Sequence, residues 1–121
     1  MRTLCPVCRV AYEMADMDTF EEIQKWLGPD EGKLLYGASG CDVCHGTGYS
    51  ARTGVFEILV ISKAVRRLIM NKQPLQVIRD KAIEDGTIEF RQAALLKVAQ
   101  GETTVEEVFR VVPSEYLGVE E

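Results

Sequence analysis

The stretches CPVC at residues 5–8 and CDVC at residues 41–44 contain all four cysteines of the chain. A C-x-x-C pair on a tight turn points its two sulfurs to the same side, and the 32 residues 9–40 form a loop that can bring the two turns together. Four thiolates arranged in this way can bind one tetrahedral Zn²⁺ ion. The sequence therefore predicts a closed structural zinc site with the ligands Cys5, Cys8, Cys41 and Cys44.

Three other roles for the cysteines have weaker support. Two disulfides would suit a secreted protein, but nothing in the chain resembles a secretion signal. Residues 41–45 fit the C-x-x-C-H signature for attachment of c-type haem, although that role leaves the first pair unused. A thioredoxin-like redox pair would need a βαβ context, which the sequence does not display. His45 is the only histidine, and we expect it to face solvent or lie behind the sulfurs rather than bind metal. No catalytic residue is predicted.

Length and charge limit the function further. At 121 residues the chain makes one ordinary domain or two very small ones, and its net charge is −5. Residues 1–61 carry 5 basic and 9 acidic side chains, so the cysteine half is acidic and a poor match for nucleic acid. No apolar run approaches the ~20 residues of a membrane span, so we expect no direct membrane insertion. Paired cysteines without a signal peptide indicate the cytoplasm.

The pattern of apolar residues predicts an α+β fold, with a small four-cysteine module followed by a mostly helical region. Before the second cysteine pair, an amphipathic helix is expected around residues 19–27, with Trp26 covering a small core. The β-branched and aromatic residues 53–61 predict a strand that pairs with residues 34–36 or completes a sheet elsewhere. We expect a zinc module over residues 1–53, and a strand followed by helices over residues 54–121.

Four helices are predicted after residue 61. Ser62 caps the first, Pro74 begins the second, the third covers residues 88–99, and overlapping capping boxes at Thr103 and Thr104 begin the fourth. We expect these helices to bury their own apolar faces and to fold without the metal. One face of the first helix forms a basic stripe, which we define as Lys63, Arg66, Arg67 and Lys72. The stripe is either a solvated surface or a contact for a partner.

The order of motifs resembles one protein family. It begins with RTLCPVC at residues 2–8 and continues with GCDVCHGTGYSARTGVFE at residues 40–57. Residues 91–97, Gly101 and TTVEEV at residues 103–108 complete the pattern. In these features the chain resembles the C-terminal part of ATPases that drive type II secretion or type IV pilus assembly. Ala51 is one departure, because the family commonly has glycine there. Since only four residues precede Cys5, we expect Met1 to fall at a boundary within a longer chain.

The resemblance implies a larger parent protein: a cytoplasmic, homohexameric motor that binds ATP and Mg²⁺ through a RecA-like core. It also implies that the four cysteines hold zinc. The expected partners are neighbouring subunits and the inner-membrane platform proteins of the secretion or pilus machine, through which the motor is peripheral to the membrane. These 121 residues contain no G-x-x-x-x-G-K-[ST] sequence, so we expect this chain by itself neither to bind ATP tightly nor to hydrolyse it.

A second family shares part of the pattern. Residues 41–48 resemble a repeat of the zinc region in J-domain co-chaperones, which would make the chain a module that binds protein substrates. That family uses four such repeats, whereas only one cysteine pair here is followed by the glycines. The repeat count therefore favours the ATPase family.

Overall fold

A computed structural model describes residues 1–13 and 17–113 of the chain. It confirms the α+β class, with short antiparallel strands and helices of at most ten residues among the described residues. The chain forms two compact units. The first contains residues 1–55 and 90–121, and the second contains residues 56–89. The two units are described separately.

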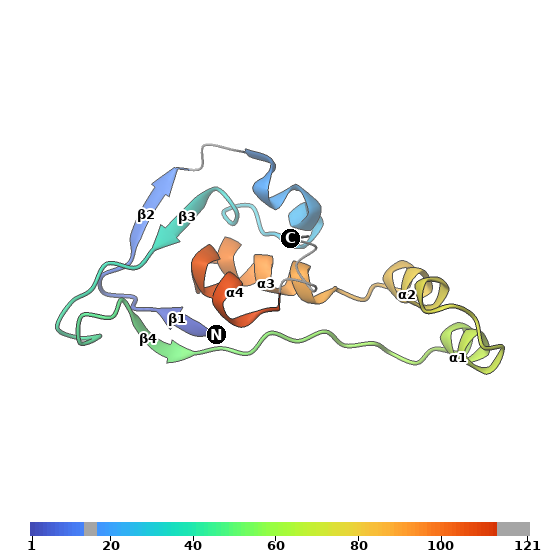
Figure 1. The fold of residues 1–121 in the computed structure, drawn as a ribbon. Helices are drawn as coiled ribbons and strands as arrows, with labels where there is room; N and C mark the ends of the chain where they lie inside the picture. Colours follow the sequence, from blue (N-terminus) through green and yellow to red (C-terminus); the bar gives the residue numbers. More distant parts are fainter. Residues whose placement is uncertain (14–16, 114–121) are drawn as a thin grey trace. The chain divides into compact units, whose positions relative to one another are not determined.

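The first unit contains two small antiparallel sheets (Figure 1). Strand β1 (Arg2–Leu4) pairs with β4 (Tyr49–Arg52), so the two ends of the cysteine half lie together. Strand β2 (Val10–Glu13) pairs with β3 (Leu34–Gly37), and both of these strands lie between β1 and β4 in the sequence. Two-stranded sheets are only marginally stable in isolation, so these strands need packing or a metal to hold them.

The predicted pairing of residues 53–61 with residues 34–36 is wrong. Strand β3 pairs instead with β2, in a register that places Tyr36 opposite Ala11. Thr53 still exchanges backbone hydrogen bonds with Met1, but residues 54–61 are extended and belong to neither sheet. Loop length does not favour this choice, because 20 residues separate β2 from β3 and 15 separate β3 from Thr53. Residues 49–52 pair with β1 instead, which directs the residues that follow them along the other sheet.

Three helices build the core of the first unit. The 3₁₀ helix η1 (Met17–Trp26) packs against α3 (Phe90–Ala99), which also contacts α4 (Val105–Val111). The buried cluster consists of Phe20, Ile23, Ala94, Val98, Ala99, Val108 and Val112. Trp26 is partly buried against this cluster, in agreement with its predicted position. The expectation that all later helices bury their own faces is wrong for α3 and α4, because they share a core with the cysteine half.

Hydrogen bonds also join the residues just before α4 to strand β1. The amide N–H of Leu4 donates to the carbonyl of Glu102 over 2.8 Å. The hydroxyl of Thr103 donates to the carbonyl of Arg2, also over 2.8 Å. The predicted helix begins with Thr104 as its N-cap, whose hydroxyl accepts from the N–H of Glu107. The bonds of Leu4 and Thr103 link segments that lie about a hundred residues apart in the sequence.

The second unit contains α1 (Lys63–Met70) and α2 (Leu75–Glu84), which pack against each other. Ser62 caps α1 as predicted, since its hydroxyl accepts from the N–H of Val65 over 3.2 Å. Pro74 precedes α2, and Gly86 adopts a left-handed φ of 105° just after it. A non-glycine residue would be strained in that conformation, so the glycine ends the helix.

Candidate metal centre

The strand pairing brings the two cysteine turns together. The first turn joins β1 to β2, and the second joins β3 to β4. Strand β1 pairs with β4, and β2 pairs with β3. The β1–β2 turn and the β3–β4 turn therefore begin and end on neighbouring strands, which brings them close together. Cys5 and Cys44 are buried, whereas Cys8 and Cys41 are partly exposed. The site is therefore built by the fold of the first unit alone.

The four sulfurs lie close enough together to bind one metal ion. All four Sγ atoms lie within 4.8 Å of one another. Cys5 to Cys41, Cys8 to Cys44, and Cys41 to Cys44 each measure 3.8 Å between sulfurs. A tetrahedron with Zn–S bonds of ~2.3 Å has sulfurs ~3.8 Å apart at each edge. The cluster could hold one tetrahedral metal ion with no open position for a reacting water.

Backbone N–H groups point at the sulfurs and favour their charged form. Gly40 donates to the sulfur of Cys8 over 3.3 Å. The sulfur of Cys44 accepts from Cys41 over 3.3 Å and from Gly48 over 3.2 Å. Such donors orient metal ligands and stabilise thiolates, so the turns are suited to holding deprotonated cysteines.

Two glycines allow the turns to come this close. Gly40 has φ 124°, and a Cβ added to it would lie 2.8 Å from the carbonyl oxygen of Gly46. Gly48 has φ 81°, and its added Cβ would lie 2.6 Å from the Cβ of Ala38. Any side chain at either position would push apart the backbone that carries the N–H donors.

The pKa values of two thiols differ widely because the four groups interact. Burial disfavours the charged form of Cys44, but the N–H groups of Cys41 and Gly48 outweigh it and lower the pKa of Cys44 to about 6. The N–H of Gly40 favours the Cys8 thiolate, yet burial and the neighbouring sulfurs raise the pKa of Cys8 to about 11. One thiolate forms readily at neutral pH and discourages the next. A divalent cation removes that repulsion, since metal binding displaces thiol protons.

The geometry bears on the other roles of the cysteines. The cysteines are free, and sulfurs 3.8 Å apart are well beyond the ~2.05 Å of a disulfide bond. A haem-attachment role for residues 41–45 would not account for the approach of the first pair to the second. His45 is exposed, has φ 58° and lies outside the sulfur cluster. The arrangement is best suited to a metal bound by four thiolates.

The structure also contains an ionic cluster that the sequence did not predict. The Glu107 side chain is fully buried, and its carboxylate accepts hydrogen bonds from Arg2 and Arg110. The pKa of Glu107 lies well below its usual range, mainly because Arg110 donates hydrogen bonds to the carboxylate. The bonds from Arg2 lower this pKa further, whereas burial acts in the opposite direction. The sequence signal was the Thr104-x-x-Glu107 capping box, in which the glutamate normally bonds to its own helix. Here the carboxylate instead reaches a strand 105 residues away.

Comparison with known proteins places the chain in a family. The family model described as Type II/IV secretion system protein matches residues 1–110. That match covers most of the chain, including the four cysteines and the helices of the first unit. The chain belongs to the type II/IV secretion system protein family, as its motifs suggested.

Individual relatives agree with this assignment. The type II secretion system protein E of Dickeya dadantii is 40% identical over 116 residues, which cover 95% of this chain and 22% of the relative. The type II secretion system ATPase E of Vibrio cholerae is 40% identical over 114 residues, which cover 92% of this chain and 21% of that relative. The type IV pilus assembly ATPase TfpB of Acinetobacter baylyi is 31% identical over 113 residues, which cover 93% of this chain and 19% of that relative. The chain spans about a fifth of the length of these curated relatives.

Proposed function

We propose that this chain is the cysteine-bearing portion of an ATPase that powers type II protein secretion or type IV pilus assembly. The observation that carries the proposal is the family match over residues 1–110, together with relatives of both kinds that align with more than nine-tenths of the chain. Within such a motor, the four-cysteine centre has a structural role, because four protein ligands leave no coordination position for chemistry.

We propose that Cys5, Cys8, Cys41 and Cys44 bind one structural Zn²⁺ ion. The sulfur spacing and the N–H donors support this ligand set. The ion would neutralise thiolates that otherwise repel one another and would hold a module spanning residues 1–53. Structural zinc contributes on the order of 10 kcal/mol in small peptides, far more than two-stranded sheets can supply.

The zinc proposal is tested by measuring metal content on freshly purified protein with elemental analysis. We expect one zinc per chain in the wild type and almost none in Cys41→Ser. The control is His45→Asn, because asparagine tolerates the left-handed backbone at that position and the histidine is not a proposed ligand. Wild-type protein without metal, or loss of zinc in the His45 variant as well, would contradict the assignment.

The nucleotide chemistry is proposed for the whole protein rather than for these residues. A phosphate-binding loop is absent from the 121-residue sequence, and without its backbone N–H groups and lysine a nucleotide site loses most of its affinity. We expect calorimetric titration of this chain with Mg·ATP to show no tight binding. A protein extended to the length of the relatives should bind ATP, and saturable tight binding by the short chain would overturn this division of roles.

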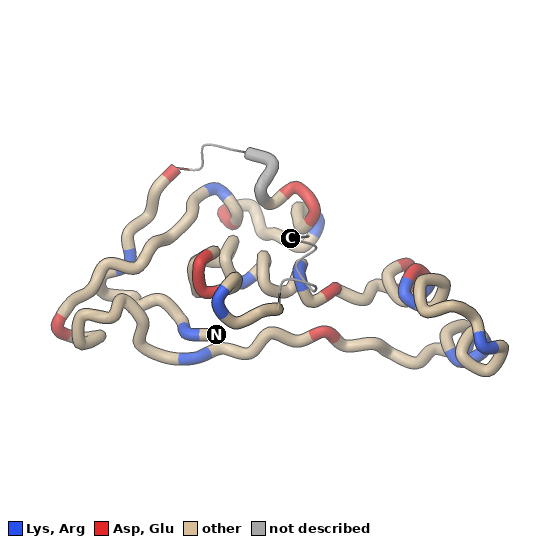
Figure 2. Tube along the Cα trace, viewed as in Figure 1, with Lys and Arg blue, Asp and Glu red and all other residues tan. Residues whose placement is uncertain are grey.

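The partners proposed are neighbouring subunits of a homohexamer and a platform protein at the inner membrane. The basic stripe supports a contact surface, because its four members are exposed along and just after α1 (Figure 2). The acidic excess of residues 1–61 provides the opposite charge on the same chain. Opposite patches on one subunit allow head-to-tail contacts that close into a ring. None of the described helices has the length and apolar character needed to cross a lipid bilayer.

This surface is tested by charge reversal in the hexamer-forming protein. The double variant Arg66→Glu with Arg67→Glu should weaken subunit assembly or stimulation of ATPase activity by the membrane partner, and should leave zinc content unchanged. The effect should shrink at high salt, because exposed ion pairs mainly steer association and are screened. The control reverses Arg79→Glu on α2, outside the stripe. Wild-type assembly, stimulation and salt dependence in the double variant would mean that the stripe is only a solvated surface.

A further inference from the structure

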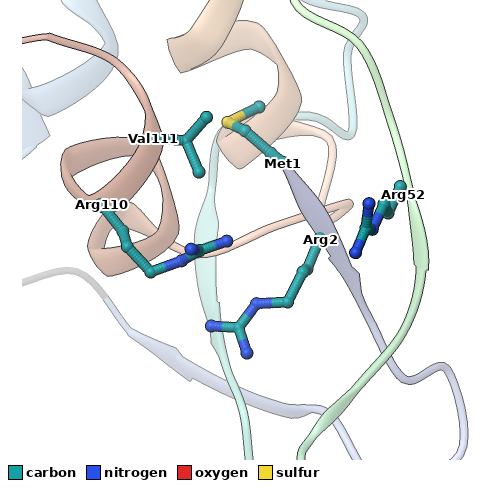
Figure 3. Close-up of a pocket in the computed structure, with 5 residues that line it drawn as sticks. All are labelled: Met1, Arg2, Arg52, Arg110 and Val111. Carbon is teal, nitrogen blue, oxygen red and sulfur yellow. The ribbon is translucent and has the colours of Figure 1, made fainter.

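Three arginines of the first unit surround one open pocket of about 490 Å³ (Figure 3). Arg2 comes from β1, Arg52 from β4 and Arg110 from α4, and the pocket is completed by the side chains of Met1 and Val111. Figure 3 shows Arg2 and Arg110 extending toward each other, with Arg52 on the neighbouring strand. The chain as a whole is acidic, so this concentration of positive charge is a local feature.

Two of the arginines are fixed in position by the same carboxylate. Glu107 accepts from Nε and Nη2 of Arg2, the latter over 2.9 Å, and from Nε and Nη2 of Arg110. Arg2 is held further by the ring of Tyr49, whose centroid lies 4.2 Å from its guanidinium carbon. A guanidinium that is already immobilised loses less entropy when it binds a ligand. Each of these two arginines uses one edge for Glu107, and its Nη1 has no acceptor among the described residues.

The third arginine has no countercharge in the described part of the chain. Arg52 lies directly opposite Arg2 in the β1–β4 pair. Like charges at such cross-strand positions destabilise a sheet, and an anion between them would reverse that effect. Glu107 supplies one negative charge against the three positive charges of the arginines. These four side chains therefore carry an excess of two positive charges, and the ammonium group of Met1, which also lines the pocket, adds a third.

From this geometry we infer that Arg2, Arg52 and Arg110 form a binding site for a phosphate group. A phosphate dianion balances the excess charge of the three arginines and Glu107, and its tetrahedral oxygens can accept from several guanidinium groups at once. A single carboxylate would offset only half of that excess and has fewer oxygens to share among three arginines. The phosphate can be free or can belong to a phosphate monoester, because the pocket is open and larger than the ion. This site is separate from the sulfur cluster and does not depend on the ATPase assignment.

The test titrates the 121-residue chain with inorganic phosphate by calorimetry, in a buffer free of other oxyanions and at constant ionic strength. We expect saturable binding of one phosphate, weakened about five- to tenfold in Arg52→Gln, as expected for loss of one charge-assisted hydrogen bond at an exposed group. The matched control, Arg66→Gln on α1, should bind like the wild type. Arg52 is exposed and lies outside the Glu107 network, so the variant should retain its fold, which circular dichroism checks.

Titrations with a phosphate monoester and with acetate identify the source of the anion. A phosphate monoester that binds more tightly than inorganic phosphate, with the same dependence on Arg52, would assign the site to an organic phosphate. Weaker binding of the monoester would assign it to the free ion. Acetate that binds as tightly as phosphate would overturn the inference in favour of an acidic protein side chain. Absence of saturable phosphate binding, or equal binding by Arg52→Gln and the wild type, would also overturn it.

Discussion

Glu107 belongs to a local helix-capping motif, but its carboxylate contacts a strand that lies far away in the sequence. Its position three residues after Thr104 belongs to a helix start, and its N–H does bond to the Thr104 hydroxyl. Its carboxylate, however, is buried and accepts hydrogen bonds from Arg2 and Arg110, whose own side chains are about half exposed. A buried carboxylate that lost either arginine would remain charged and poorly solvated, so all three residues depend on one another.

We expect Glu107→Gln to lower the free energy of unfolding by about 2–3 kcal/mol. This is less than the ~3–5 kcal/mol for breaking a fully buried ion pair, because the two arginines are half exposed and partly solvated. Urea denaturation of the metal-loaded chain measures the change. Glu106→Gln is the matched control, since Glu106 is exposed on the same helix and should change stability by less than ~0.5 kcal/mol. Equal stability of both variants would contradict a stabilising ion cluster.

Acid should remove the contribution of Glu107. Hydrogen bonds from Arg110 and then Arg2, opposed by burial, lower the pKa of this carboxyl in the folded chain below its unfolded value of ~4.3. The stabilisation is therefore complete above about pH 4.5 and is lost progressively as the pH falls toward the lower folded value. The stability difference between wild type and Glu107→Gln should shrink between about pH 4.5 and pH 3.5. A difference that is constant over this range would show that the carboxylate charge is not responsible.

At the scale of elements, residues 56–61 stand out because they lie outside both described sheets although their composition favours a strand. Phe56, Ile58 and Val60 alternate along the segment and are about 70% exposed. They line a groove of about 760 Å³ in the second unit, together with the start of α1 and the residues that follow α2. An extended, exposed and apolar segment is a template for pairing with another strand.

We expect residues 56–61 to form a paired strand in a protein of the relatives' length, where additional chain can supply the partner. Hydrogen–deuterium exchange read by mass spectrometry tests this. The amides of the segment should exchange at least about tenfold more slowly in the longer protein than in the 121-residue chain. The amides of α1 are the internal reference, because their hydrogen bonds lie within the helix. Fast exchange of residues 56–61 in both proteins would contradict the expectation.

At the scale of the molecule, the cysteine centre and helices α3 and α4 belong to the same compact unit. Strand β1 leads into Cys5 and is also bonded to residues 102–107. The core cluster then joins α3 and α4 to η1. A metal that fixes the two cysteine turns should therefore stabilise helices that begin more than forty residues after Cys44.

Removal of the metal should expose this coupling. We expect a strong chelator to increase amide exchange throughout the β1–β4 sheet, α3 and α4, and to change the exchange of α1 and α2 far less. The reason is that the first three elements belong to the first unit and the last two to the second. Mass spectrometry of chelated and zinc-restored protein provides the measurement and its control. Unchanged protection of α3 and α4 after zinc loss would indicate that they fold independently of the cysteine half.

The amino-acid sequence by itself determined the local features of this protein. The spacing of the cysteines, the caps at Ser62 and Thr104 and the amphipathic helices were predictable, because each depends on residues only a few positions apart. The tertiary structure decided which distant segments meet. It paired β3 with β2, left residues 54–61 outside both sheets, and placed Glu107 between Arg2 and Arg110. Such contacts arise from competition among many possible long-range pairings and from shared burial, which a local pattern does not encode.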